Sequence, residues 1–297
     1  MGIRETSQHS QCGVCIRHKE ILKKLGNDQR ARLAQLAQYL KHLARQYSDR
    51  AVYWRSRTVS RLPLLPDGTR SVTMITDGMD KSKFRVPRTR VVSSKDFQGF
   101  LRPSLEMSCV IAHGFNVVLA ISPPHLKKDS SWCVDLVSHS LHQLGKSIDT
   151  RSIELVIQSD NCGRETKNNT LLRWAGLMTG TFRVKRIELR FLETGHSHED
   201  VDQYFSSVAQ FIEQHSEIHT ASSFVDVLNK FHSDRNIRPH EAERFAYLVD
   251  QTRDWKVFLQ LACRYNHVKG IAGRGAPHVF AFDRAADIPG LWEFSRC

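Results

Sequence analysis

The sequence predicts an α/β fold with one mixed sheet and helices on both faces, and three observations lead to it. First, between residues 68 and 216 short apolar runs alternate with stretches whose apolar residues recur every three or four positions. Second, no helical stretch separates the first three apolar runs, whereas the later ones are separated by helical stretches. Third, acidic residues stand after two of the strands and at the start of the last helix. The predicted order is βββαβαβα.

The net charge favours acidic partners. The 297 residues carry a formal charge of +12, and the hydrophobic content of 40% is typical of a globular protein rather than a disordered one. The first 60 residues hold 12 Lys plus Arg against 4 Asp plus Glu, so most of the excess is N-terminal. Nucleic acid is therefore the first partner we expect and an anionic membrane surface the second, although a solvated basic helix is the simpler alternative.

The sequence predicts an intracellular protein, in the nucleus or another compartment. It contains no apolar run long enough to span a membrane and no segment that resembles a secretory signal, so we expect it to be neither transmembrane nor secreted. The seven cysteines are odd in number and irregularly spaced, which is typical of reduced thiols rather than of a disulfide framework.

The only close cysteine pair lies in the polar N-terminal segment. Cys12 and Cys15 are flanked by His9 and His18 at regular spacing. Two thiolates and two imidazoles are the ligands that bind zinc tetrahedrally. The pattern therefore allows a zinc site at Cys12 and Cys15, and an ordinary pair of surface thiols is the alternative.

A long amphipathic helix follows the cysteine pair. It is predicted from Asn27, a residue suited to capping, to about Arg57. Its basic face either contacts phosphates or keeps the helix soluble, and its apolar face is a candidate for packing on the core. The stripe comprises Leu33, Leu36, Ala37, Leu40, Leu43, Ala44, Tyr47, Ala51 and Trp54. Prolines and glycine at 61–68 mark a linker, so residues 1–62 form the first predicted segment.

The second predicted segment is the central one, residues 68–216, and the third is a mainly helical C-terminal extension, residues 217–297. In the central segment we expect strands at 72–76, 104–112, 115–121, 153–158 and 184–192, and helices at 130–144, 165–178 and 200–213. In the extension we expect helices at 222–231 and 254–265, then one short strand at 279–282. Three antiparallel strands followed by αβαβα is the layout of the ribonuclease H-like fold.

Acidic residues follow two of the central strands and open the last helix. Asp77 follows the first strand, Asp160 follows the fourth, and Asp200 and Asp202 begin the helix. The predicted strand order brings these positions to one edge of the sheet. Carboxylates that converge in this way bind two Mg²⁺ or Mn²⁺ ions in phosphodiester chemistry. The third ligand is Asp202 or Asp200, and Glu199 is also available.

Basic and histidine residues accompany the acids. His196 and His198 are expected to orient the carboxylate on the helix or to contact the scissile phosphate. Phe84 lies within a basic loop and is a candidate for stacking on a base. The loop either binds a phosphate backbone or is simply solvated. Its cations are Lys81, Lys83, Arg85, Arg88 and Arg90.

Three segments resemble a family of uncharacterised, transposon-derived DDE transposase or integrase-like domains. The segments are ITDGMDKSKFRVP at 75–87, VIQSDNCGRETKNN at 156–169 and GHSHEDVDQYF at 195–205. The resemblance implies a ribonuclease H-like fold and a mobile-element origin. It also assigns Asp77 as the first acid of the DDE motif, Asp160 as the second, and Asp202 or Asp200 as the third.

Our leading hypothesis is a metal-dependent polynucleotidyl transferase that cleaves and joins DNA in recombination, either active or degenerate. Its expected partners are DNA and a second copy of the chain. An alternative is a domesticated, non-catalytic nucleic-acid-binding or interaction module of the same fold. A third reading is an ordinary ribonuclease H-type nuclease. Convergence of the three carboxylates is the observation that bears most directly on the choice.

Overall fold

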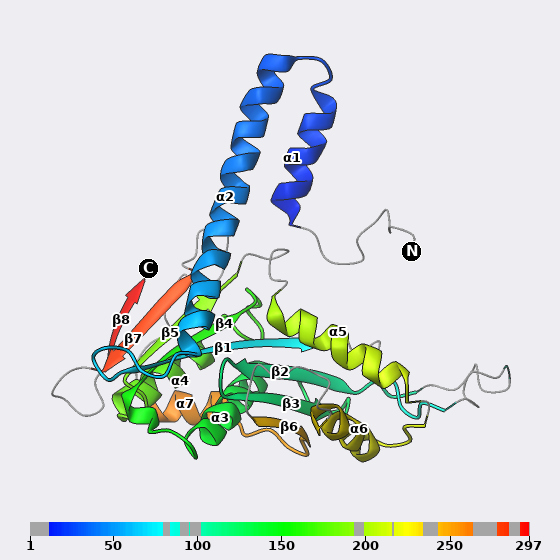
Figure 1. The fold of residues 1–297 in the computed structure, drawn as a ribbon, viewed down its shortest axis with the longest axis vertical. Helices are drawn as coiled ribbons and strands as arrows, with labels where there is room; N and C mark the ends of the chain where they lie inside the picture. Colours follow the sequence, from blue (N-terminus) through cyan, green and yellow to red (C-terminus); the bar gives the residue numbers. More distant parts are fainter. Residues whose placement is uncertain are drawn as a thin grey trace.

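One mixed sheet of eight strands organises the molecule, in the order β6-β3-β2-β1-β4-β5-β7-β8 (Figure 1). Strand β2 is antiparallel to β1 and β3, whereas β4 runs parallel to β1 and β5 parallel to β4. The strands are β1 (Arg70–Met79), β2 (Glu106–Ala112), β3 (Asn116–Ser122), β4 (Ile153–Ser159), β5 (Arg186–Phe191), β6 (Glu243–Leu248), β7 (Val279–Arg284) and β8 (Trp292–Arg296). This computed structural model describes residues 12–79, 84–89, 95, 102–192, 199–215, 217–233, 243–263, 278–284 and the backbone of 292–296.

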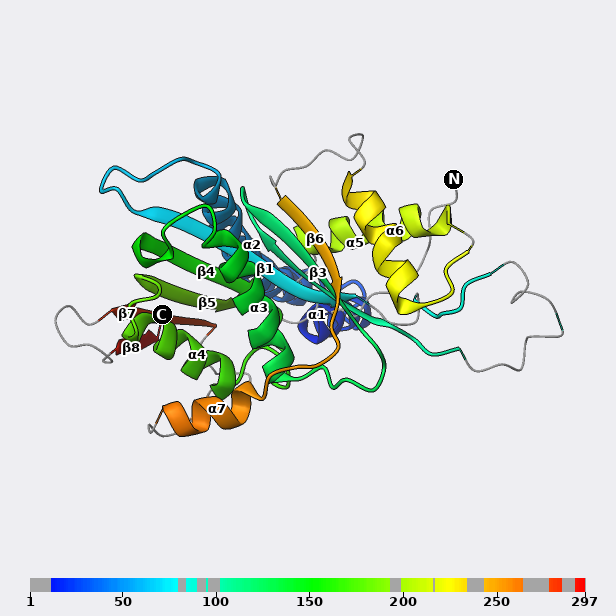
Figure 2. The ribbon, with the colours of Figure 1, turned by 90° about the horizontal axis from the view of Figure 1, so that it is seen from below.

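Helices cover both faces of the sheet, and each face has its own apolar core (Figures 1 and 2). On one face lie α3 (Ser130–Leu144), α4 (Asn169–Gly180) and α7 (Trp255–Ala262). On the other lie α5 (Asp200–Glu213), α6 (Ala221–Ser233) and the last turns of α2 (Gln29–Ser60). Because both faces are covered, the central strands are apolar almost throughout, as in all seven buried residues of β3.

The order of the central elements is the one predicted. The chain runs β1, β2, β3, α3, β4, α4, β5, α5, with a short 3₁₀ turn before β4. Helix α4 begins at Asn169 rather than at residue 165, because the Asn168 side chain accepts hydrogen bonds from the N–H groups of Thr170 and Leu171. In α2 the cap is Asp28 rather than Asn27, and its side chain accepts from the Ala31 N–H at 3.0 Å. The α/β class and the mixed sheet are thus confirmed.

Residues 217–297, predicted as a mainly helical extension with one short strand, also extend the sheet. Besides α6 and α7, these residues contribute three strands that extend the sheet on both sides. Strand β6 pairs parallel to β3, while β7 pairs antiparallel to β5 and β8 to β7. The physical reason is that β3 and β5 would otherwise expose unpaired backbone groups. Phe280 and Phe282 of β7 are fully buried in the core, so this segment is part of the domain.

The N-terminal helices α1 (Gly13–Lys24) and α2 form a hairpin that extends away from the sheet (Figure 1). Only the base of α2 joins the core: Tyr53 is fully buried, whereas Leu33, Leu40 and Tyr47 are exposed. The predicted apolar stripe therefore packs on the domain only at its C-terminal end. Although α2 is 32 residues long, no helix among the described residues, α2 included, is apolar enough over the required length to cross a membrane.

Candidate active site

Asp77 and Asp160 lie side by side at one edge of the sheet. Strands β1 and β4 are parallel with Thr76 beside Ser159, so the two aspartates occupy the next position along each strand. Alternation along β1 places Asp77 on the same face as Ile75, which packs in the core under α5. Both carboxylates therefore emerge at the carboxyl end of the parallel strands, near the start of α5.

Asp202, in the first turn of α5, lies near enough for its charge to act on Asp77. Burial raises the pKa of Asp77 to about 6, and the negative charges of Asp160 and Asp202 contribute to this rise against a hydrogen bond from the Gly78 N–H. Burial likewise raises the pKa of Asp160. Because one charge shifts the pKa of another group appreciably only at short range, Asp160 and Asp202 lie in the neighbourhood of Asp77. Among the described residues, however, only Cys12, Cys15 and His42 place three ligand atoms within 4.8 Å of one another, so the three carboxylates are not in direct metal-bridging contact.

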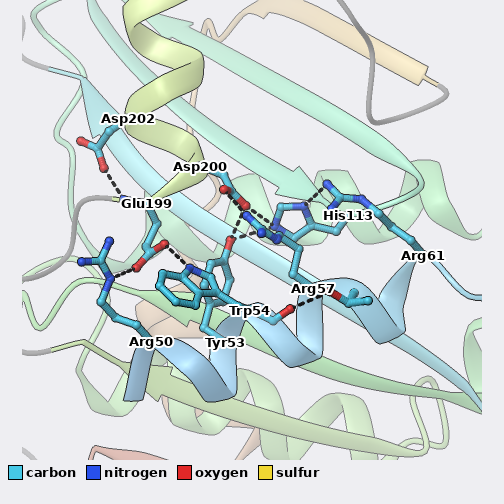
Figure 3. A network of polar contacts seen from close by, with 10 residues as sticks. Arg50, Tyr53, Trp54, Arg57, Arg61, His113, Glu199, Asp200 and Asp202 are labelled. Carbon is cyan, nitrogen blue, oxygen red and sulfur yellow. Dashed lines mark hydrogen bonds and ion pairs between the residues drawn. The ribbon is translucent and has the colours of Figure 1, made fainter. Parts of the chain in front are cut away.

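Glu199 is directed away from this group, towards α2 (Figure 3). Its side chain is 3% exposed, pairs with Arg50 at 2.6 Å and accepts a hydrogen bond from Trp54 Nε1 at 3.0 Å. The backbone N–H of Glu199 in turn donates to Asp202 Oδ2 at 2.9 Å, which is half of a capping box. Glu199 is therefore a structural anchor that also orients Asp202.

Asp200 also faces α2 (Figure 3). It forms an ion pair with Arg57, accepts a hydrogen bond from the Tyr53 hydroxyl at 3.1 Å and lies 3.5 Å from His113 Nε2. Burial opposes its ionisation, but the Arg57 hydrogen bond and the neighbouring His113 outweigh burial and lower the pKa of Asp200. These partners favour Asp202, rather than Asp200, as the third acid.

A lysine and a glutamate that the sequence patterns did not single out lie at the same edge. Lys128, just before α3, pairs with Glu165 Oε2 at 3.3 Å. Its ammonium group occupies the space that a Cβ atom on residue 78 would need, so Gly78 permits its approach. The positive charge of Lys128 lowers the pKa of both Asp77 and Asp160, against the rise that burial causes. In the sequence, only the glycine directly after Asp77 indicated that another group approaches this strand closely.

Asp160 is held in place by the turn that precedes α4. Thr166 Oγ1 donates to Asp160 Oδ1 at 2.9 Å, and the Cys162 N–H donates to the same oxygen at 3.3 Å. Hydrogen bonds of this kind fix the orientation of a carboxylate and leave its other oxygen for a ligand.

The described part of the basic loop forms a pocket beside α5. Arg85 and Arg88 line a cavity of about 420 Å³ together with Arg102, which the sequence patterns did not single out. Phe84 is 3% exposed and packs against Phe224 with ring centroids 5.5 Å apart. The suggestion that Phe84 stacks on a base is therefore wrong, because its ring belongs to the core. Other predicted site residues lie outside the described part of the chain: Lys81, Lys83, Arg90, His196 and His198.

A second group of metal-binding side chains lies in the helical hairpin. Cys12 and Cys15 meet His42 of α2, and the ligand atoms of all three lie within 4.8 Å of one another. His18, which the spacing suggested as a ligand, instead lies 2.6 Å from Gln35 Nε2 through its Nδ1 atom. His9 lies outside the described residues.

Comparison with known proteins yields a family but no characterised relative. No curated protein matches the chain, and no solved structure does. Residues 101–293 match the family described as a domain of unknown function, DUF7869. The matched segment contains Asp160 and Asp202 and begins after β1, which carries Asp77. Because the match spans well over half of the chain, the protein belongs to the DUF7869 family.

Proposed function

We propose that this protein is a metal-dependent polynucleotidyl transferase of the DDE transposase or integrase type. The observation that supports the proposal is that Asp77 of β1 and Asp160 after β4 lie at one sheet edge, where the charges of Asp160 and of Asp202 in α5 act on Asp77. Like charges are costly to hold together in partly buried positions, and a divalent cation offsets that cost. Such an arrangement is typical of functional sites rather than of structural ones.

The strand topology supports a ribonuclease H-like fold for the catalytic domain. The central strands follow the order β3-β2-β1-β4-β5, with β2 antiparallel to the others. Helices α3 and α4 cover one face and α5 the other. This is the layout that the resemblance to DDE enzymes implies, and it accounts for convergence of the acids at one edge.

The donor atoms fit Mg²⁺ or Mn²⁺. Carboxylate oxygens are hard ligands that these ions prefer, and Asp77, Asp160 and Asp202 would hold them. When bound, the ions would activate the attacking oxygen of water or of a 3′-hydroxyl and stabilise the leaving oxygen. Lys128 offsets part of the negative charge, and its ammonium group is placed to contact a phosphate at the same edge.

DNA is the substrate that the surface charge favours. Arg85, Arg88 and Arg102 line one pocket beside α5, the helix that carries Asp202. Arginine pairs with phosphate groups bidentately, and the overall charge of +12 adds a sequence-independent attraction.

The same observations favour the second candidate, a domesticated nucleic-acid-binding module without catalysis, and turnover distinguishes the two. A mobile-element origin and action in the nucleus belong to the first candidate.

Strand cleavage and joining by the purified full-length chain test the proposal. We expect nicking of supercoiled DNA, or joining of a 3′-hydroxyl end to a target strand, in Mg²⁺ or Mn²⁺ and not in chelator. Asp77→Asn, Asp160→Asn and Asp202→Asn should each lower the rate by roughly 100-fold or more, because each removes a charged ligand. Calorimetric titration of Mn²⁺ should show loss of affinity in the same variants, independently of activity.

The matched control is Asp149→Asn, whose carboxylate is exposed and pairs with Arg151. It should retain both activity and metal affinity. If the wild-type chain binds DNA tightly but turns over neither substrate with either metal, the binding module is the better description. If the three variants bind Mn²⁺ as well as the wild type does, the carboxylates are not a metal site and the proposal fails.

A further inference from the structure

Helix α1 buries little of its surface. Helix α1 has 12 residues, and Cys15 is its only buried member. A helix of this length is marginally stable by itself, so its position depends on what holds it to a neighbour. Near the turn Arg32 donates to the carbonyls of Leu22 and Gly26 at 3.1 and 3.2 Å. These hydrogen bonds lie near the turn and do not hold the N-terminal end of α1 against α2.

At the N-terminal end of α1 the side chains of Cys12, Cys15 and His42 lie together. Cys12 is the N-cap residue of α1 and Cys15 lies in its first turn, so both thiols face the same end of the helix. His42 approaches them from the middle of α2, with Nε2 3.5 Å from Cys12 Sγ. Cys12 and Cys15 are both buried although most of α1 is exposed.

The spacing of these atoms suits a tetrahedral zinc ion. With Zn–S bonds of about 2.3 Å and Zn–N bonds of about 2.0–2.1 Å, tetrahedral geometry places sulfur and nitrogen roughly 3.6 Å apart. The Cys12 to His42 separation of 3.5 Å agrees with this, and all three ligand atoms lie within 4.8 Å of one another. Thiolate and imidazole together select zinc over the hard cations that suit the carboxylate site.

Neighbouring side chains would hold the ligands in orientation. The Tyr39 hydroxyl donates to the Cys15 sulfur. The His18 ring stacks between Tyr39 and His42, with centroids 5.3 and 6.2 Å away. Hydrogen bonds and packing around ligands are typical of metal sites, where they fix ligand orientation.

We propose that Cys12, Cys15 and His42 bind one zinc ion that closes the α1–α2 hairpin. Binding releases the thiol protons to solvent. The described residues supply three ligand atoms, which leaves the fourth position of the tetrahedron for water or another donor. The ion links residues that are 30 positions apart in sequence and fixes α1 against α2. The site is separate from the three carboxylates and does not depend on the proposed catalytic function.

Metal content of the full-length chain, without an affinity tag, tests this proposal. Protein purified under reducing conditions from zinc-supplemented cells should contain close to one zinc ion per chain by mass spectrometry. The metal-free protein titrated with Co²⁺ should develop the intense visible bands of a tetrahedral thiolate complex, and Zn²⁺ should abolish them. Cys12→Ser, Cys15→Ser and His42→Ala should each lose most of the zinc and the cobalt bands.

Two control variants carry the same substitutions elsewhere: Cys263→Ser at a half-buried thiol and His142→Ala at an exposed imidazole. Both should keep the zinc, as should Asp77→Asn. Circular dichroism checks that each ligand variant keeps the folded domain, and chelation should increase hydrogen exchange in α1 while the sheet stays protected. The proposal is overturned by reduced protein that takes up neither zinc nor cobalt, by a Cys12–Cys15 disulfide in protein isolated anaerobically, or by full zinc content in His42→Ala.

Discussion

At the scale of single residues, the environment of Asp77 disfavours its charged form. It is partly buried beside two other carboxylates, and its pKa rises to about 6 from an ordinary value of 3.8. A carboxyl group that must ionise at a partly buried position reduces the stability of the fold at neutral pH. Proteins typically retain such groups where they serve a function.

We predict that Asp77→Asn stabilises the metal-free protein at neutral pH. Because the pKa of Asp77 is higher in the folded state, that state binds more protons between about pH 4 and 6. The stability that this group contributes is therefore present at low pH and lost as the pH rises through about 6. Over this range the free energy of unfolding of the wild type should fall by on the order of 1–3 kcal/mol on account of Asp77. Asparagine has no such loss, so the difference between the two proteins should grow over this window.

Urea unfolding from about pH 4 to pH 8 in the presence of chelator measures this difference, and other titrating groups cancel in the comparison. Saturating Mg²⁺ should remove or reverse the advantage of the variant. Parallel pH profiles for the wild type and the variant would show that Asp77 is not destabilised in the folded state.

A second residue-scale prediction concerns Gly78 and Lys128. An alanine at position 78 would occupy the site of the Lys128 ammonium, which can move at low cost because it ends a flexible side chain. We expect Gly78→Ala to change stability little, by about 0.5 kcal/mol or less. It should raise the pKa of Asp77 further, because Lys128 no longer offsets the burial and the neighbouring acids.

Carbon-detected NMR titration of the Asp77 carboxyl provides the measurement. Lys128→Met should produce a shift of the same sign and size, and the double variant should add nothing to either. An unchanged titration in Gly78→Ala, with a clear shift in Lys128→Met, would mean that the Lys128 ammonium still lies near Asp77 when alanine occupies position 78.

At the scale of elements, the base of α2 fixes the start of α5. Glu199 and Asp200, which open α5, are held by Arg50 and Arg57 of α2 (Figure 3). The last residue of α2 also reaches the sheet, where Ser60 Oγ donates to the His113 carbonyl at 2.7 Å and accepts from the Thr73 N–H at 2.9 Å. The basic helix is thus partly a structural element of the domain, and its arginines near the sheet neutralise buried carboxylates.

We predict that Arg50→Met lowers the free energy of unfolding by about 1–3 kcal/mol, because the Glu199 carboxylate, 3% exposed, loses its charged partner. Arg45→Met, on an exposed part of the same helix, should change it by roughly 0.5 kcal/mol or less. Denaturant unfolding of the two variants makes the comparison. Adding Glu199→Gln to Arg50→Met should recover part of the loss. Equal stabilities of Arg50→Met and Arg45→Met would argue against Glu199 as a structural anchor.

At the scale of the whole molecule, a domain built on one open eight-stranded sheet carries a basic helical arm. Strands from the C-terminal segment complete both sides of the sheet, and the α1–α2 hairpin extends from one face (Figures 1 and 2). The first 60 residues hold 12 of the 43 Lys and Arg residues, so under the proposed function we expect the arm to contact DNA away from the three acids.

We predict that two N-terminal deletions behave differently. Removing residues 1–44 takes away most of the hairpin but leaves the base of α2, so thermal melting should change little while DNA affinity and its salt dependence fall together. Each lost phosphate contact should reduce the slope of log affinity against log salt by about one. Removing residues 1–60 also removes Tyr53 and the partners of Glu199, so that protein should melt at a markedly lower temperature or fail to fold.

Fluorescence anisotropy with labelled DNA at several salt concentrations, alongside thermal melting, separates these outcomes. An unchanged salt slope after removal of residues 1–44 would leave the basic side chains of the hairpin as solubilising charge. An unchanged melt after removal of residues 1–60 would show that the domain does not need α2.

The sequence by itself determined the order of strands and helices in the central segment and the positions of Asp77 and Asp160 at strand ends, because both depend on local periodicity along the chain. Only the tertiary structure decided which partners the acids of α5 meet: Glu199 and Asp200 bind side chains of α2, whereas the charge of Asp202 acts on Asp77. It likewise placed Lys128 beside Gly78, His42 beside Cys12, and strands β6 to β8 at the sheet edges. Each of these contacts joins residues far apart in the chain, and no local pattern encodes which distant partner a side chain will meet.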